Sequence, residues 1–278
     1  MIKSILLSVD GSVYTDAQVK HAIDLAKACQ ARLKVISIVD VRIFEWAVVM
    51  GTDGFVPVIP SNVYKEETKR ILEDKASAIL EKCQSILLEA GIEFETEKIY
   101  GAPVDVILEK SRLVDMLIIG ARGEFAKWKK NMVGATLDAV MRQWNKPLLI
   151  TPQKFRKMSK IIFAYDGSDR SNKALQLAGF FATQLEAGLS VLTVHDKPSM
   201  RQKFLNEARA YLEPYHVAFD LTGVAGHPEK EIVQVADETG CDLIIMGAFG
   251  HSRIREAILG STTEQVIRNA NIPVLLSK

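Results

Sequence analysis

The 278-residue chain is poor in cysteine and carries almost no net charge. Its three cysteines, Cys29, Cys83 and Cys241, lie far apart and form no C-x-x-C pair. This spacing argues against a disulfide framework and a zinc site, and it favours a reducing compartment. A formal charge of +1 provides no field that would hold a nucleic-acid backbone or an anionic membrane surface. We therefore expect no nucleic-acid partner.

Long apolar segments are also missing. No stretch approaches the roughly 20 apolar residues that a membrane-spanning helix needs. The first apolar run, 5–9, ends at Asp10 and is too short for a signal peptide. We expect a cytoplasmic protein without a membrane span.

Common catalytic signatures are absent as well. No glycine precedes a lysine, so there is no Walker A loop, and neither G-x-G nor G-x-S-x-G occurs. The histidines form no metal-ligand cluster with cysteines or carboxylates. The sequence therefore indicates no catalytic residue and no metal ligand.

An internal repeat is the main feature that the sequence does contain. KSILLSVDGS at 3–12 matches KIIFAYDGS at 160–168, and DMLIIG at 115–120 matches DLIIMG at 242–247. Each half also closes on a short apolar run that follows a proline. The repeat predicts two copies of one domain, at 1–153 and 158–278.

Strands and helices alternate in each half. The near-continuous apolar runs predict strands at 3–9, 33–39, 93–99, 115–119, 147–151, 160–165, 189–195, 216–223, 242–246 and 273–277. Helical patterns lie at 13–30, 62–90, 103–112, 135–144, 169–186, 199–213, 228–238 and 261–270. This order predicts an α/β fold of two tandem doubly wound domains, each with a five-stranded parallel sheet flanked by helices.

The first half carries an insertion. Asp10 and Gly120 are 110 residues apart, whereas Asp166 and Gly247 are 81 apart, a difference of 29 residues. The extra residues fall within about 41–75 and are typical of an apolar loop at 41–60 that continues into a longer helix. Two interpretations stay open, an ordinary surface loop or an apolar contact region.

Ligands of such folds bind at the carboxyl ends of the strands. Asp10 and Asp166 end the first strands of the two halves, and Val39 and Val194 lie at the ends of the second strands. The aspartates could contact a ligand there, or they could only stabilise Asp-Gly-Ser turns and cap the following helices.

A glycine loop follows the fourth strand of the second half. Gly247 and Gly250 are followed, after nine residues, by Gly260, Ser261 and Thr262 at the start of a predicted helix. Glycines let backbone N–H groups approach an oxygen cluster, and a helix N-terminus with unpaired donors binds phosphate. The spacing therefore predicts a phosphate site.

The first half departs from this pattern. Gly120 and Gly123 are followed by ten residues rather than nine before Gly134, and Ala135 replaces the serine before Thr136. The loss of a hydroxyl donor and the longer loop weaken the prediction of a phosphate site in this half.

These motifs resemble those of universal stress protein domains, in tandem over essentially the whole chain. The resemblance implies an adenine nucleotide alpha hydrolase-like fold that binds ATP, with or without Mg²⁺, at the carboxyl ends of the strands. In the second half it implies that Asp166 and the Val194 backbone hold the adenosine end, and that Met246 and Gly247 line the ribose. It assigns the phosphates to Gly250, Gly260, Ser261 and Thr262, and His251 could face the same oxygens. The matching first-half residues are Asp10, Val39, Gly120, Gly123, Gly134 and Thr136.

Two functions compete. The leading hypothesis is a nucleotide-dependent regulatory or stress-response module that binds ATP mainly in its second domain and hydrolyses it slowly at most, because no base is positioned for the reaction. The alternative is a nucleotide-independent interaction or ligand-sequestering protein that uses the apolar 41–60 insertion. The last strands of the halves, 148–151 and 274–277, are expected to pair within one polypeptide as an internal pseudo-dimer. A protein partner or a homodimer stays open.

Overall fold

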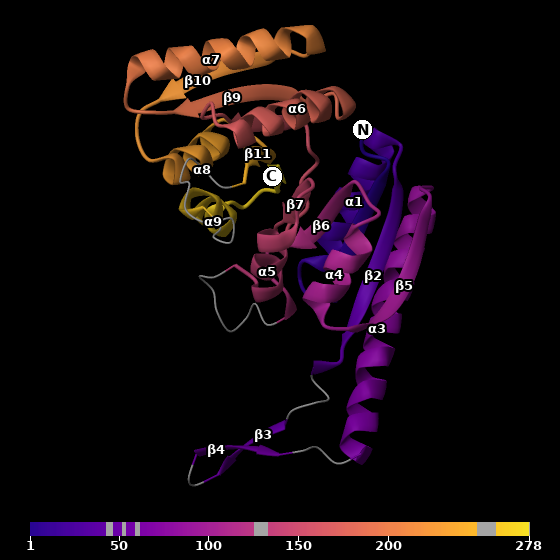
Figure 1. Cartoon of the computed structure of the whole chain (residues 1–278). Helices are drawn as coiled ribbons and strands as arrows, with labels where there is room; N and C mark the ends of the chain where they lie inside the picture. Colours follow the sequence, from indigo (N-terminus) through magenta and orange to yellow (C-terminus); the bar gives the residue numbers. More distant parts are fainter. Residues whose placement is uncertain (43–46, 52–53, 59–61, 125–132, 249–259, 278) are drawn as a thin grey trace.

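The computed structural model describes residues 1–42, 47–51, 54–58, 62–124, 133–248 and 260–277. Its main feature is a single ten-stranded sheet with the strand order β10-β9-β8-β11-β12-β7-β6-β1-β2-β5 (Figure 1). Neighbouring strands run parallel everywhere except between β12 and β7. The predicted α/β class is confirmed.

Five strands of this sheet belong to residues before 152. The elements of that half are β1 (Ser4–Val9), α1 (Thr15–Cys29), β2 (Arg32–Asp40), β3 (Ala47–Gly51), β4 (Gly54–Val58), α3 (Asn62–Ala90), β5 (Phe94–Gly101), α4 (Pro103–Ser111), β6 (Met116–Gly120), α5 (Ala135–Gln143) and β7 (Leu148–Thr151). Of these, β3 and β4 form a separate sheet.

The other five strands follow residue 159 and repeat the same alternation. They and their helices are β8 (Lys160–Ala164), α6 (Asp169–Gln184), β9 (Gly188–Val194), α7 (Pro198–Leu212), a short 3-10 helix (Glu213–Tyr215), β10 (Phe219–Val224), α8 (Pro228–Glu238), β11 (Leu243–Gly247), α9 (Ser261–Asn269) and β12 (Val274–Ser277). Most bounds agree with the sequence prediction within one or two residues.

The two halves of the sheet meet at β7 and β12. Val274 pairs with Ile150 and Leu275 with Leu149, in antiparallel register. The expected pairing of the last strands within one polypeptide is therefore confirmed, and it makes the sheet continuous across the repeat.

Apolar cores lie on both faces of the sheet. Helices α1, α3, α6 and α7 supply residues to one core, and α4, α5, α8 and α9 supply the other. Strand residues alternate between them, so that Phe163 packs in the first core and Ile162 in the second. Burial on both faces explains why the central strands, such as β6 and β12, are unbroken apolar runs in the sequence, whereas the edge strands β5 and β10 contain charged residues and are only partly buried.

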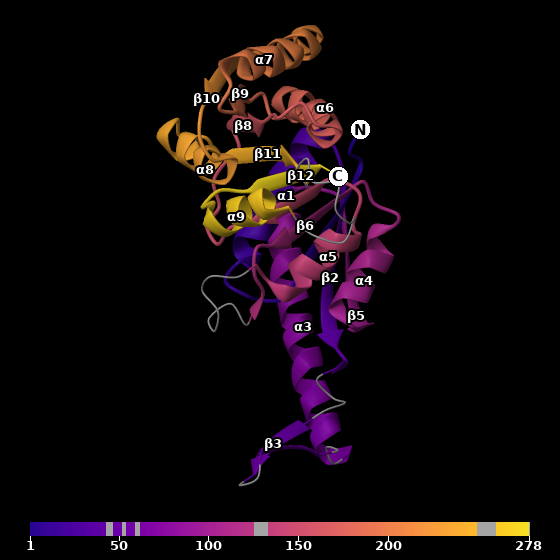
Figure 2. The same ribbon diagram turned by 60° about the vertical axis from the view of Figure 1, so that its left-hand side comes forward.

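The expected loop at 41–60 is the main error of the sequence prediction. The structure places two antiparallel strands there, β3 and β4, with Gly51 opposite Gly54. Two apolar runs with two residues between their closing glycines are a hairpin signal that the loop assignment overlooked. Within the described residues, these strands pair only with each other, and Figures 1 and 2 both show them at the far end of α3, away from the large sheet.

Candidate functional site

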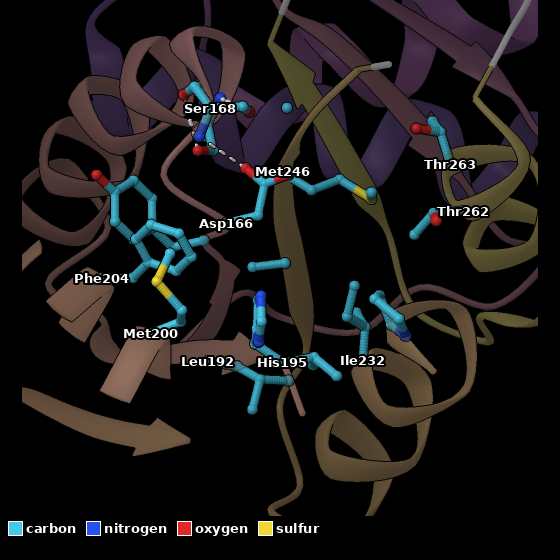
Figure 3. Close-up of a pocket in the computed structure, with 16 residues that line it drawn as sticks. Asp166, Ser168, Leu192, His195, Met200, Phe204, Ile232, Met246, Thr262 and Thr263 are labelled. Atoms are coloured by element: carbon cyan, nitrogen blue, oxygen red, sulfur yellow. Dashed lines mark hydrogen bonds between the residues drawn. The ribbon is translucent and has the colours of Figure 1, made fainter. Parts of the chain in front are cut away.

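A cavity of about 530 Å³ lies in the second half, at the carboxyl ends of β8, β9 and β11 (Figure 3). Its wall combines the β8–α6 turn, the end of β9, helices α7 and α8, the end of β11 and the first turn of α9. The residues predicted from the sequence that line it are Asp166, Val194, Met246, Gly247 and Thr262. Segments from across the second half thus converge on one hollow.

Asp166 occupies the turn between β8 and α6. Its Oδ1 accepts the N–H of Ser168 at 3.0 Å, and Ser168 caps α6 by accepting the N–H of Ser171 at 3.2 Å. The capping role therefore belongs to Ser168, while Asp166 stabilises the turn. The half-buried Asp166 also lies on the cavity wall, so the turn holds an acceptor at the edge of the hollow.

The end of β9 brings backbone groups to the cavity. The Leu192 carbonyl accepts the N–H of Tyr165 at 2.9 Å, so the backbone of Leu192 faces β8. Alternate residues of a parallel strand direct their backbone groups to the same neighbour. Val194 is the next residue on that side, but β8 already ends at Ala164. Its backbone groups therefore lie beyond the end of β8, and Val194 is on the cavity wall.

Much of the wall is apolar and was not predicted from the sequence. Met200 and Phe204 come from α7, Ile232 from α8 and Leu192 from β9. Such a surface suits a flat, largely apolar ring system, and a few polar groups of the protein would orient that ring. The four-residue spacing of Met200 and Phe204 puts both on one face of α7, which is the signal that could have found them.

Tyr165 is part of the same wall and packs against Phe204. Its ring meets the Phe204 ring edge-on, with centroids 6.3 Å apart. Burial, together with the neighbouring Glu207 carboxylate, raises the pKa of Tyr165 to about 12. The neutral phenol donates to Oδ1 of Asn172 at 2.7 Å, which fixes the ring against Phe204.

Gly247 serves the packing of the protein itself. A Cβ there would lie 2.9 Å from the carbonyl carbon of Arg170 and from the backbone nitrogen of Ser171. The missing Cβ therefore lets the first turn of α6 approach the end of β11. The sequence did not predict this packing role.

The start of α9 forms another part of the wall. Gly260 precedes this helix in an extended conformation, and the first N–H groups of the helix have no side-chain cap. Thr262 lies on the cavity wall, whereas Gly260 and Ser261 do not. Gly250 and His251 lie outside the described residues.

The corresponding loop in the first half is bonded to its own aspartate. Asp10 Oδ2 accepts the N–H of Glu124 at 3.0 Å, and Oδ1 accepts the N–H of Ser12 at 2.9 Å. A Cβ on Gly123 would lie 2.9 Å from Asp10 Oδ2. Lys75 of α3 then forms an ion pair with the Glu124 side chain. The insertion helix and Asp10 together hold the loop.

The described ends of this loop are bonded to each other. The Gly134 N–H donates to the Ala121 carbonyl at 3.0 Å, and a Cβ on Gly134 would lie 3.1 Å from Cα of Arg122. A Cβ on Gly120 would lie 2.9 Å from Cβ of Tyr14. These glycines therefore make room for the loop's own backbone and for a neighbouring side chain.

The last two first-half residues lie at the end of β2 and the start of α5. Val39 is buried at the end of β2, and Thr136 is half-buried in the first turn of α5. The predicted first-half residues are thus near one sheet edge, but the loop and Asp10 bond to each other there.

Two further features of the described residues concern the requirements of a metal site and of a membrane-spanning helix. The part of the chain that the structure describes contains no group of three or more His, Cys, Asp or Glu side chains arranged to hold a metal ion. Among the same residues, no helix combines the length and apolarity that crossing a membrane requires.

Comparison with known proteins gives consistent matches. The model of the universal stress protein family matches residues 1–152 and 199–278. The universal stress protein Slr1230 of Synechocystis sp. is 32% identical, and the match covers 99% of both chains. The crystal structure of a universal stress protein from Archaeoglobus fulgidus is 22% identical, with a TM-score of 0.77 over 99% of this chain and 98% of that one, so the fold is shared. A universal stress protein in complex with cAMP is 29% identical and matches 44% of this chain and 97% of its own, with a TM-score of 0.40.

Proposed function

The chain belongs to the universal stress protein family, and we propose that it is a nucleotide-dependent regulatory module of the stress response that binds ATP mainly in its second half. The observation that carries this proposal is the second-half cavity, which is lined by Asp166, Val194, Met246, Gly247 and Thr262. The sequence motifs and the family resemblance point to the same five residues.

The chemistry of the wall supports the assignment of the two ends. The apolar side chains Met200, Phe204 and Ile232 suit a nucleobase, and Asp166 offers an acceptor beside them. The uncapped start of α9, with Thr262, provides donors for phosphate oxygens. With no general base assigned, the bound nucleotide is expected to turn over slowly at most.

Calorimetric titration with ATP tests this function, with Mg²⁺ and with EDTA in parallel. We expect about one ATP per polypeptide, because Asp10 and Glu124 of the first half already bond to each other. Gly260→Val should weaken binding at least tenfold, since a branched residue would crowd the start of α9. Its backbone, at φ −60° and ψ 137°, accepts valine without strain.

Gly134→Val is the matched control. Gly134 has almost the same backbone angles, φ −60° and ψ 136°, and precedes α5 in the first half. Its added side chain would crowd the Arg122 backbone of the first half, so the control should leave the ATP affinity of the second half within twofold of the wild type. Absence of heat with the wild type, or equal affinities in both variants, would reject the assignment to the second half.

A second candidate function rests on the hairpin of β3 and β4. Within the described residues it joins no other strand, and a two-stranded sheet on its own is only marginally stable in water. The first half of α3, which follows it, exposes Val63 and Ile71. We propose on this basis that the hairpin contacts a protein partner or a second copy of the protein.

Replacing residues 43–61 by a short Gly-Ser linker separates the two candidates. If the hairpin mediates self-association, the mass measured by light scattering should fall to that of one polypeptide while ATP affinity stays unchanged. A loss of ATP binding in this variant would instead link the hairpin to the nucleotide site.

A further inference from the structure

His195 lies where β9 ends and contributes to the cavity wall. In the view of Figure 3 its imidazole stands between Met200 and Ile232. The ring also meets Phe204 edge-on, with centroids 6.3 Å apart.

The tautomer of this histidine is fixed by the protein. The backbone N–H of Lys197 donates to Nδ1 of His195 at 3.0 Å. Nδ1 can accept this bond only with its lone pair, so the proton of the neutral ring is on Nε2. Within the described residues, no bond to Nε2 accompanies the one at Nδ1. The imidazole therefore has one donor left to offer.

The backbone of His195 is equally constrained. Its N–H donates to the Val224 carbonyl at 3.0 Å, and its carbonyl accepts Nη1 of Arg201 at 2.6 Å. Both backbone groups and Nδ1 are thus engaged by β10, α7 and the turn between β9 and α7. Such a residue loses little freedom when a ligand binds, which favours a strong and directional hydrogen bond.

Resting on the function proposed above, we propose that His195 is a specificity-determining residue that donates its Nε2–H to a ring nitrogen of the bound base. The neighbouring wall residues Leu192, Met200, Phe204 and Ile232 are apolar and offer no competing acceptor side chain. The single free N–H of His195 can serve one acceptor, and a purine presents several ring nitrogens that each accept a single N–H.

Two substitutions distinguish this role from general packing. His195→Asn keeps an acceptor near the position of Nδ1 for the Lys197 N–H but lacks a donor at the position of Nε2. His195→Gln retains a donor near the Nε2 position. We expect ATP affinity to fall about tenfold in His195→Asn, which is the loss expected from one neutral hydrogen bond. In His195→Gln the affinity should stay within about threefold of the wild type.

Base analogues then identify the acceptor. Calorimetry of the full-length protein would compare ATP with 1-deaza-, 3-deaza- and 7-deaza-ATP, each of which replaces one ring nitrogen by C–H. In the wild type, one analogue should bind about tenfold more weakly than ATP. In His195→Asn the same analogue and ATP should bind equally, because the donor is already missing.

Each outcome decides the proposal. If the wild type binds ATP and all three analogues equally, or if the analogue penalty persists in His195→Asn, the His195 contact is wrong while nucleotide binding stands. If the wild type binds no nucleotide, the proposed function and this inference fall together. Matching urea unfolding transitions for both variants would show that a loss of affinity does not arise from misfolding.

Discussion

Gly167 lies directly against the ring of Phe204, so closely that a Cβ at Gly167 would be 2.4 Å from Cε1 of the ring. Gly167 belongs to the turn that holds Asp166, and Phe204 lies on the apolar wall of the same cavity. Its φ of +72° is left-handed, a conformation that glycine adopts readily. The polar and apolar sides of the candidate site are therefore joined at this contact.

Gly167→Ala should be strongly destabilising. The left-handed backbone costs a residue with a Cβ about 1–2 kcal/mol, and overpacking against Phe204 adds about 1–3 kcal/mol. We expect the free energy of unfolding from urea titration to fall by about 2–5 kcal/mol, the sum of these two costs. ATP affinity should fall as well, because Phe204 must move.

Gly240→Ala separates the two contributions. Gly240 has a φ of +67°, and a Cβ there would meet nothing within 4 Å. In this control variant the free energy of unfolding should fall by only about 1–2 kcal/mol, and the ATP affinity should not change. Equal losses in the two alanine variants would show that the contact with Phe204 is unimportant.

The large sheet could be predicted because its signals are local and repeated. The central strands are apolar runs buried on both faces, and each half offers the same order of strands and turns. The hairpin was missed because Pro57 and the apolar run around it resembled a loop, although Val56 and Pro57 lie within β4. A proline is tolerated at a strand edge, and β4 pairs with only one described strand.

The candidate site was only partly predictable. Asp10 and Asp166 belong to the same Asp-Gly-Ser motif, yet Asp10 accepts the N–H of Glu124, a long-range contact that no local motif specifies. Phe204 and Met200 have the pattern of ordinary core positions of a helix, because an apolar helix face does not reveal whether it covers a strand or a cavity. Long-range packing decides both cases.

Stability should decline in mild acid because of His21. This imidazole is fully buried, and neither ring nitrogen has a hydrogen-bond partner in the described structure. Burial lowers the pKa of His21 from 6.5 to about 4. The unfolded protein therefore takes up a proton at a higher pH than the folded one. The stabilisation that follows from keeping His21 neutral is fully present above pH 6.5. It is lost progressively between pH 6.5 and 4, which lowers the free energy of unfolding by up to about 3 kcal/mol.

Urea unfolding at several pH values from neutral to mildly acidic checks this expectation. His21→Phe should flatten that part of the pH profile, whereas His216→Asn should not. His216 is exposed and left-handed, at φ +52°, which asparagine tolerates. An unchanged slope in His21→Phe would mean that other groups cause the acid sensitivity.

Asp242 is expected to stabilise the start of the second half. Its carboxylate accepts the backbone N–H groups of Ser159 and Lys160 at 2.9 and 2.8 Å and the Ser159 hydroxyl at 2.7 Å. Asp242→Ala leaves these donors without their acceptor and should lower the free energy of unfolding by about 3 kcal/mol. Urea unfolding measures this change.

The first half contains the matching residue. Asp115 accepts the N–H groups of Lys3 and Ser4 at 2.8 and 2.9 Å, but it is more exposed than Asp242. Water can replace part of the lost bonding in Asp115→Ala, so this variant should lose less than Asp242→Ala. A larger loss at Asp115 would contradict the argument from burial.

The junction between β7 and β12 should hold the two halves together without a covalent link. Leu149 and Leu275 face each other across it, and each is only 1% exposed. Co-expressed fragments 1–155 and 156–278 should therefore copurify through a tag on either one. Leu275→Glu should separate them, because a carboxylate would be buried in the core without a partner. Leu113→Glu, at a position that is 88% exposed, should leave the pair intact. If the unmodified fragments elute separately in size-exclusion chromatography, the junction depends on the linker, and covalent connection rather than strand pairing keeps the halves in register.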